Sequence, residues 1–289
     1  MNAARLRPRF FPFTPRTGAA VSPIEVQRFE PGHIVGSFGL HGHYFNEIVV
    51  FDRPGGTHIV GGEERQIEFG DIDALGTGQL HDASNFGAAH GWMLLFHDDA
   101  LVSDAIPDGI LTWFSRPGEL QQGRCRAEGS ALKRIFSLLA AIEAEQTHQN
   151  EGFRAAIRSL FSLLVIELGR LNGSRSAPDD GRVYRYLRRL ISIVDDNIES
   201  TLTLAFLAEQ LELSGGYLTT EIRRATGRTV MDWVLQRRMH EARRRLLETS
   251  DSIETIANAL KFEDSSHFAR RFRTLHGSSP AKWRSMLKS

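Results

Sequence analysis

The sequence predicts an α+β protein of two domains, in which an N-terminal β-barrel and its following helices precede an all-α C-terminal domain. Its 289 residues suit two domains of roughly 100–200 residues each. Short apolar segments separated by turn sequences fill residues 24–97, whereas apolar residues at helical spacing dominate from residue 129 onward. The charge also changes sign, because residues 1–181 hold 16 Lys/Arg and 22 Asp/Glu while residues 182–289 hold 19 and 13. An acidic half joined to a basic half indicates two modules, the second suited to a polyanion.

The segment 24–97 is expected to be all β. Its apolar runs are rich in Val, Ile, Phe and Trp, and they include Phe45–Phe51, His58–Val60 and Trp92–Phe96. Glycine-containing turn sequences, such as Pro54-Gly55-Gly56 and Gly76-Thr77-Gly78, lie between the runs. Several short strands at this spacing predict a barrel or a sandwich.

Two amphipathic helices are expected between residues 129 and 171. The first has an apolar stripe made of Leu132, Ile135, Phe136, Leu139 and Ile142. The second carries apolar residues at steps of 3 and 4, close to a coiled-coil seam, and these are Phe153, Ile157, Leu160, Leu164, Leu168 and Leu171. Two interpretations of the second helix stay open, namely packing within one chain and the seam of a homodimer.

A polar segment rich in Gly, Ser and Asp coincides with the change in charge sign and predicts an interdomain linker at 172–181. The first domain then spans residues 1–171, and the second spans residues 182–289. Within the second domain, apolar residues at helical spacing predict one long helix at 230–247.

The basic half contains an internal repeat. Residues 218–233 align with residues 268–283 at a separation of 50, and apolar residues, a glycine and a tryptophan coincide. Farther upstream, Leu207-Ala208 matches Ile256-Ala257 at a separation of 49. Each copy predicts a short helix, a tight turn and a second helix, which is the layout of a helix-turn-helix.

Four residues are expected to bound the helices of this repeat. Thr203 and Ser214 are suited to cap the two helices of the first copy. Gly227 and Gly277 are suited to the left-handed position that ends each second helix. Arginines on or beside the second helices are suited to phosphate oxygens, and these are Arg223, Arg224, Arg228, Arg270, Arg271 and Arg273, with Arg237, Arg238, Arg243, Arg244 and Arg245 on the long helix.

Residues 190–286 resemble the DNA-binding domain of AraC/XylS-type transcription regulators. The matching stretches are Leu207-Ala208, Leu213-Ser214, Tyr217-Leu218, Thr226-Gly227, Arg238 to Ala242, Leu246-Leu247, Ile253 to Ala257, Phe262 to Phe268 and Gly277 to Pro280. The resemblance implies two helix-turn-helix units joined by the long helix, each placing one helix in one of two successive major grooves. Three residues depart from the usual pattern: Lys261 replaces a glycine, Ile222 an aromatic residue and Arg245 a leucine.

The resemblance also implies which side chains read base edges. They are Thr219, Thr220 and Arg223 in the first copy, and Ser265, Ser266, His267 and Arg270 in the second. Arg270 is the strongest candidate, because arginine can bind guanine O6 and N7 together. Gly216 stands where the family often has a larger contact residue, which weakens readout by the first copy. The family further implies an activator that works with RNA polymerase on double-stranded DNA.

The β segment carries two motifs that resemble those of cupin barrels. His41, His43 and Glu47 match H-x-H-x3-E, and His81 begins a matching H-x3-N, although Gly76 replaces a usual proline. Three interpretations stay open: ligands for Fe, Mn, Ni or Zn as in enzymatic cupins, the lining of an effector pocket, or histidines satisfied within the barrel. The attached DNA-binding domain favours the effector pocket, with no metal and no cofactor. Several histidines favour an anionic or hydroxylated effector.

The sequence therefore predicts a sequence-specific DNA-binding transcription regulator, not an enzyme, that a small-molecule effector controls. Two other classes stay open, a metal-dependent cupin enzyme with an accessory DNA-binding domain and an interaction module whose helical domain binds protein. The single cysteine, Cys125, excludes a disulfide or a cysteine-based metal site within the chain. No apolar run approaches the roughly 20 residues of a membrane span, and residues 1–14 lack the apolar core of a secretory signal. A cytoplasmic protein without a membrane partner is expected.

Overall fold

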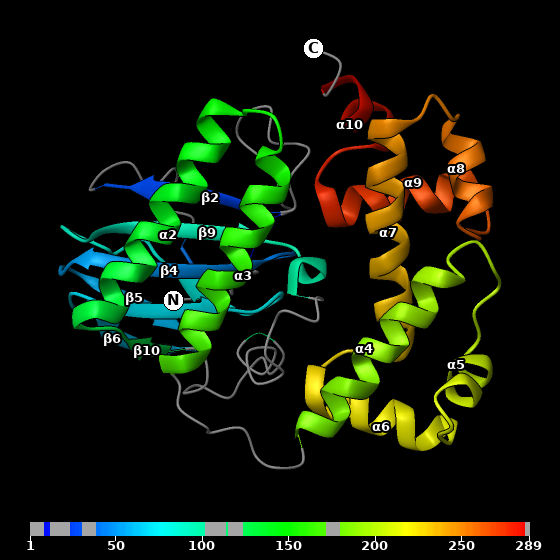
Figure 1. The fold of residues 1–289 in the computed structure, drawn as a ribbon, viewed down its shortest axis with the longest axis horizontal. Coiled ribbons are helices and arrows are strands. Elements are labelled where there is room, and N and C mark those ends of the chain that lie inside the picture. The colour runs from blue at the N-terminus through cyan, green and yellow to red at the C-terminus, as the bar shows by residue number, and fades with distance from the viewer. Residues whose placement is uncertain are drawn as a thin grey trace, which may run out of the picture.

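The computed structural model describes residues 9–11, 24–30, 39–101, 114, 124–171 and 180–286. A strand-rich domain covered by two helices stands beside a helical domain in Figure 1, which confirms the predicted two-domain α+β architecture. The linker predicted at 172–181 lies outside the described residues except for its last two positions, which begin helix α4. In the part of the chain that is described, no helix has the length and apolar character needed to cross a membrane.

The described strands form two five-stranded sheets, ordered β1-β3-β8-β5-β6 and β10-β7-β4-β9-β2. Their pairings are antiparallel except for β1 with β3, which is parallel. The strands are β1 (Arg9–Phe11), β2 (Ile24–Phe29), β3 (His41–His43), β4 (Asn46–Arg53), β5 (Thr57–Val60), β6 (Glu63–Gln66), β7 (Asp71–Leu75), β8 (His81–Asp82), β9 (His90–Phe96) and β10 (Arg124–Arg126).

Strand β4 shows how the second sheet divides its two faces. Successive side chains of a strand point to opposite sides, and both sides of β4 are buried. Val49 and Phe51 pack with Phe86 in a small apolar cluster, whereas Ile48 and Val50 belong to the main core together with residues of the covering helices. A strand buried on both faces needs apolar residues at successive positions, which explains why the sequence shows an almost continuous apolar run at Phe45–Phe51.

Helices α2 (Gly129–His148) and α3 (Phe153–Leu171) form a hairpin that covers the second sheet in Figure 1. The ring of Phe161 on α3 meets that of Phe96 on β9 with centroids 4.9 Å apart. Ile157, Leu164 and Leu168 of the predicted seam are 0–1% exposed within the single chain. Of the two interpretations of this helix, packing within one chain therefore accounts for these three residues, and they are not available as a homodimer seam.

The described part of the helical domain consists of two long helices, α4 and α7, and five shorter ones. They are α4 (Asp180–Asp196), α5 (Leu204–Gln210), α6 (Gly215–Thr226), α7 (Val230–Glu248), α8 (Ile253–Ala259), α9 (Ser265–His276) and α10 (Pro280–Met286). With 19 residues, α7 is about 28 Å long at 1.5 Å per residue.

The predicted helix boundaries of the repeat are confirmed. The side chains of Thr203 and Ser214 accept hydrogen bonds from the backbone N–H groups of the third residues after them, at 3.2 Å in both cases. Gly227 and Gly277 adopt left-handed φ values of 69° and 71° at the C-termini of α6 and α9. Because side-chain acceptors satisfy N–H groups that lack a helical partner, and glycine takes positive φ without a Cβ clash, these four residues fix where the helices start and stop.

The turns between the helices of each unit also correspond. Glu212 in the first turn has a φ of 58°, and Lys261 in the second has a φ of 57°. Both residues therefore hold the left-handed conformation that costs a residue with a Cβ roughly 1–2 kcal/mol. The departure at Lys261 leaves the turn geometry intact and stores strain there.

Replacing Lys261 by glycine should stabilise the helical domain. We expect Lys261→Gly to raise the free energy of unfolding by about 1 kcal/mol, because glycine adopts positive φ without the Cβ clash. Lys261→Ala keeps that clash and serves as the control, with an expected change within about 0.5 kcal/mol. Urea denaturation followed by circular dichroism measures both, and a glycine variant no more stable than the alanine variant would contradict the strain.

Candidate nucleic-acid interface and barrel histidine cluster

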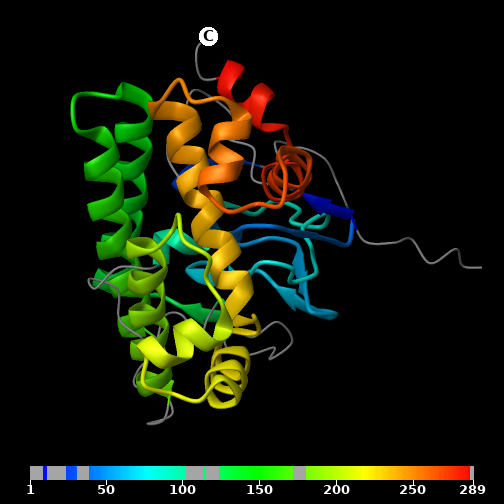
Figure 2. The ribbon, with the colours of Figure 1, turned by 90° about the vertical axis from the view of Figure 1, so that its right-hand side faces the viewer.

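Helices α6 and α9 have the same orientation at opposite ends of α7. Both lie across α7 in Figure 1, and both are seen nearly end-on in Figure 2, with α9 above α6. Their inner faces are anchored by Leu218 and Ile222 on α6 and by Phe268 and Phe272 on α9, each at most 1% exposed. Burial of one face holds each helix in place and leaves the opposite face to solvent, as entry into a DNA groove requires.

The predicted base readers lie on α6 and α9, and their exposure differs. Exposed are Thr220, Arg223, Ser266 and Arg270, and half-buried are Thr219, Ser265 and His267. The backbone N–H of His267 donates to the Asp264 carboxylate at 2.6 Å, which caps α9. This hydrogen bond first, with a smaller contribution from the charge of Arg270, holds the pKa of Asp264 below its usual value.

The arginines of the long helix α7 are engaged within the protein. Arg237 forms a two-pronged ion pair with Asp195 of α4 at 2.7 and 2.8 Å. Arg245 pairs with Glu241 at 2.7 Å and also with Glu199, which explains why an arginine is tolerated where the family usually has leucine. Arg244 pairs with Glu241 and Glu248 as well. The positive charge of α7 that the sequence suggested for phosphate binding is therefore largely neutralised by neighbouring carboxylates.

In the strand-rich domain, three of the four predicted effector residues converge. The ligand atoms of His43, Glu47 and His81 lie within 4.8 Å of one another, and all three residues are buried. Glu47 Oε2 is 3.0 Å from His43 Nε2 and 3.6 Å from His81 Nε2. The ring of His41 packs against that of His81 with centroids 4.2 Å apart, but His41 is not part of the three-residue cluster.

Backbone carbonyls fix the proton positions of these imidazoles. Nδ1 lies 2.8 Å from the Gly39 oxygen in His41, 2.6 Å from the Phe45 oxygen in His43 and 3.3 Å from the Gln79 oxygen in His81. Since a carbonyl only accepts, each Nδ1 donates, which leaves Nε2 as the second ring nitrogen of each imidazole. Nε2 of His43 and of His81 faces the Glu47 carboxylate, and a proton or another cation is needed between these atoms.

The protonation of the cluster is biased by burial and by charge. Burial acts to raise the pKa of Glu47, but the interactions with His43, and then with His81 and His58, outweigh it and lower this pKa to about 2. Burial holds the pKa of His81 well below 6.5, against the opposing pull of Glu47. At neutral pH the cluster thus contains an ionised carboxylate and a neutral His81, a set of acceptor atoms.

A fourth histidine, which lies outside the two cupin-like motifs, is held next to this cluster. His58 on β5 donates from Nδ1 to the Asp73 carboxylate on β7 at 2.8 Å, and both residues are buried. The rings of His58 and His81 are 5.8 Å apart. His58 and Asp73 are 15 positions apart on strands of different sheets, so no local sequence motif predicts the pair. Only the alternation of side chains along each strand could have indicated that both point toward the interior.

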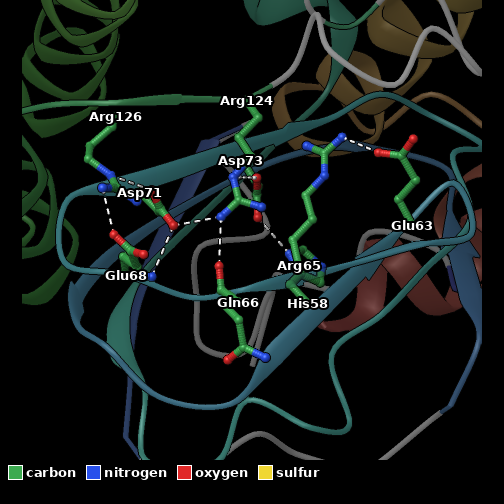
Figure 3. Close-up of polar contacts among 9 residues, drawn as sticks. All are labelled: His58, Glu63, Arg65, Gln66, Glu68, Asp71, Asp73, Arg124 and Arg126. Atoms are coloured by element: carbon green, nitrogen blue, oxygen red, sulfur yellow. Dashed lines mark hydrogen bonds and ion pairs between the residues drawn. The ribbon is translucent and has the colours of Figure 1, made fainter.

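Asp73 belongs to a charged network at the edge of the second sheet, drawn in Figure 3. The register of β10 against β7 sets Arg124 opposite Asp73 and Arg126 opposite Asp71. Arg124 lies 2.6 Å from Asp71 and 3.6 Å from Asp73, and Arg126 lies 2.8 Å from Asp71. Burial acts to raise the pKa of Asp71, but these arginines and the Glu68 backbone N–H lower it overall. Cross-strand pairs of opposite charge thus hold Asp73, the residue whose carboxylate orients His58.

The two domains touch near the end of α9. The ring of His276, the last residue of α9, meets the ring of His97, which follows β9, with centroids 5.3 Å apart, and both residues are buried. The short 3₁₀-helix Asp98–Leu101 continues this contact onto α7, and Leu101 shares the main core with residues of both domains.

Comparison with known proteins identifies the helical domain. A helix-turn-helix domain family matches residues 207–286. The activator RhaS of Yersinia pestis (strain Pestoides F) is 25% identical over 279 residues, which cover 92% of this chain and 95% of RhaS. The activator RhaR of Mannheimia succiniciproducens is 23% identical over 267 residues, which cover 91% of this chain and 92% of RhaR. The helical domain is therefore a helix-turn-helix domain, in a chain that is similar over most of its length to two transcriptional activators.

A solved structure extends the similarity to the whole fold of the chain. The apo form of a ToxT point variant from Vibrio cholerae strain SCE256 matches with a TM-score of 0.51 and 11% identity, covering 92% of this chain and 98% of ToxT. At this identity the match concerns architecture alone, a strand-rich N-terminal domain followed by the paired helix-turn-helix units. The relatives are transcriptional activators, and the enzyme alternative finds no support among them.

The histidine cluster predicts an acid-dependent loss of stability in the metal-free protein. Glu47 and His81 both have a lower pKa in the folded protein than in the unfolded chain, so the unfolded chain binds more protons. Stability is therefore expected to fall as pH drops below 6.5, first through His81, and then between pH 4.5 and about 2 through Glu47.

Glu47→Gln tests this sign. Denaturation of chelator-treated protein across about pH 3 to 7 should show a smaller loss of unfolding free energy below pH 4.5 in the variant than in the unaltered chain. Glu64→Gln, on the exposed strand β6, is the matched control and should keep the original slope. Parallel curves for Glu47→Gln and the unaltered chain would contradict the lowered pKa.

Proposed function

We propose that this regulator activates transcription by placing α6 and α9 in two successive major grooves on one face of double-stranded DNA. The observation that carries the proposal is the shared orientation of the two helices at the two ends of α7. Successive grooves on one face recur about every 34 Å, and a rod about 28 Å long with a helix packed near each end is suited to that spacing. The exposed side chains of Thr220, Arg223, Ser266 and Arg270 supply contacts with the DNA.

The remaining partners follow from the activator role. The DNA-bound protein works with RNA polymerase in the cytoplasm, and it does so as a regulator and not as an enzyme. The lengthwise similarity to RhaS and RhaR, which are named as activators, supports this assignment. The domain division at 1–171, 172–181 and 182–289 gives the sensing part, the linker and the DNA-binding part.

The barrel is proposed as the effector domain, with His41, His43, Glu47 and His81 as effector contacts. Its chemistry favours one of the two classes of effector expected from the sequence. Glu47 remains ionised beside a neutral His81, so its negative charge disfavours an anion, whereas a ligand rich in hydroxyl or other donor groups is accommodated. The effector therefore belongs to the hydroxylated rather than the anionic class.

A short route connects this site to the DNA-binding domain. Glu47 on β4 lies opposite Leu95 on β9, and His97, two residues farther along, meets His276 at the end of α9. An effector changes DNA binding only to the extent that it binds the two states of this contact with different affinities.

Salt dependence and sequence selection test the proposal together. Selection from a random DNA pool should recover sites with two elements about one helical turn apart. The logarithm of the affinity should fall by about 0.9 per neutralised phosphate for each tenfold rise in salt. A flat salt profile would instead favour the interaction module that binds protein. Arg244→Ala, in an arginine held by Glu241 and Glu248, should leave the salt slope unchanged.

A metal ion is a second candidate occupant of the barrel, favoured by the donor set itself. Two imidazole Nε2 atoms and a carboxylate oxygen gather in a buried cluster, and their Nδ1–H groups are tied to carbonyls, as in many transition-metal sites. Such an ion would be held by His43, Glu47 and His81, and it would neutralise Glu47 and offer open coordination positions to an effector.

Metal analysis of the purified full chain separates this candidate from the first. Bound Fe, Mn, Ni or Zn near one ion per chain, lost in His43→Ala and kept in His148→Ala, is the result expected of a metal site. His148 is an exposed histidine on α2 and controls for surface binding. Metal far below one ion per chain, or equal loss in both variants, would exclude the site and leave the hydroxylated effector as sole occupant.

A further inference from the structure

We infer that the two helix-turn-helix units divide DNA recognition unequally, so that α9 reads the base sequence and α6 binds mainly the sugar–phosphate backbone. This inference rests on the proposed DNA-binding function and adds to it which unit determines sequence preference. It follows from a comparison of the two copies, position by position, in the structure.

The repeat permits a matched comparison because equivalent positions differ by 50. Three outward positions are exposed in both copies: Gly216, Thr220 and Arg223 on α6 correspond to Ser266, Arg270 and Arg273 on α9. The spacing of four and three residues places each trio on one helix face. The α9 face thus offers a hydroxyl and two guanidinium groups, whereas the α6 face offers one hydroxyl and one guanidinium group.

This difference decides how well each face can discriminate bases. A guanidinium group can contact guanine O6 and N7 together, whereas a hydroxyl pairs with several bases. At the central position α9 has Arg270 and α6 has Thr220. Neither Arg270 nor Arg273 forms an ion pair with another described residue, so both guanidinium groups are available to a groove.

The charges around the two helices differ in the same direction. Helix α9 contains three arginines and no carboxylate. Helix α6 contains two arginines and Glu221, and Glu221 holds Arg224 at 2.8 Å. The left-handed turn residue before each helix is exposed, and it is Glu212 in the first unit and Lys261 in the second. The excess of arginine over carboxylate is therefore greater on α9 than on α6, although two exposed carboxylates, Glu263 and Asp264, lie directly before α9.

Gly216 shows that the smaller face of α6 is not imposed by the fold. A Cβ built at Gly216 would meet no atom within 4 Å, and the residue does not have a positive φ. Glycine lowers helix stability relative to residues with a side chain, so packing and backbone geometry do not account for it. Its absent side chain allows the first turn of α6 to approach the DNA backbone closely, and it removes a base contact.

The test compares selected sites of full-length variants. In sites selected by the unaltered protein, we expect one element with defined bases and, about one turn away, an element of variable sequence. Arg270→Ala should reduce discrimination at one base pair of the defined element by about 5- to 150-fold, the fold-change equivalent of losing one bidentate contact. Arg223→Ala should weaken binding slightly and by the same factor for every DNA sequence, so that base preferences are unchanged.

A gain of preference provides the converse test. Thr220→Arg places on α6 the residue that α9 carries at the equivalent position, and it should create a guanine preference in the variable element. Arg244→Ala on α7 is the matched arginine control and should alter neither element. Circular dichroism of each variant verifies folding.

The outcomes separate this inference from the function on which it rests. Two equally defined elements, or loss of base preference in Arg223→Ala comparable to that in Arg270→Ala, would overturn the unequal division while leaving DNA binding intact. Salt-independent binding with no enriched sequence would overturn the DNA-binding function and the inference with it.

Discussion

The packing of two recognition helices on one continuous helix is the constraint on which the proposed function depends. The N-terminal half of α7 contributes Val230, Trp233 and Val234 to the core that contains the anchors of α6, and its C-terminal half contributes Met239, Ala242 and Leu246 to the separate core that contains the anchors of α9. The separation and relative rotation of the two recognition helices are therefore set by the backbone of α7, which hydrogen bonding stiffens along its length. An interface between two separately folded units would leave that spacing adjustable.

Local signals explain why so much of the helical domain could be predicted from its sequence. Capping residues, left-handed glycines and apolar positions at helical spacing act within a few residues of one another, so Thr203, Ser214, Gly227 and Gly277 are found where the pattern places them. The repeat adds independent support, because each copy tests the interpretation of the other. The turn at Lys261 illustrates the limit, since the sequence shows a missing glycine but only the φ of 57° shows that the left-handed geometry persists.

Interactions between distant segments account for what the sequence could not predict. The ion pair between Arg237 and Asp195 joins residues 42 positions apart, and the pair of His58 with Asp73 joins two sheets. From the sequence alone, Arg237 is equally consistent with binding a phosphate and with lying on a solvated helix surface. Likewise, the seam-like spacing on α3 is equally compatible with a partner chain and with the sheet beneath it, and only the burial of Leu164 and Leu168 decides between them. The cupin-like motifs indicated His43, Glu47 and His81 as neighbours, and the structure places them together. Their ionisation, however, depends on burial and packing that no sequence motif encodes.

The two repeat copies differ at the position where the second copy contacts the strand-rich domain. In the first copy, Thr226 accepts a hydrogen bond from Trp233 Nε1 at 3.2 Å, so its side chain bonds within its own helix-turn-helix unit. The equivalent position in the second copy is His276, whose ring lies 5.4 Å from Trp283 and also meets His97 of the barrel domain. The barrel thus contacts the C-terminal end of α9, while the outward positions Ser266 and Arg270 stay exposed. In the proposed mechanism, the strand-rich domain therefore acts on how α9 is held rather than by covering its outward face. Because α9 carries Arg270 on its outward face, a small change in its position would alter the base contacts proposed for that helix.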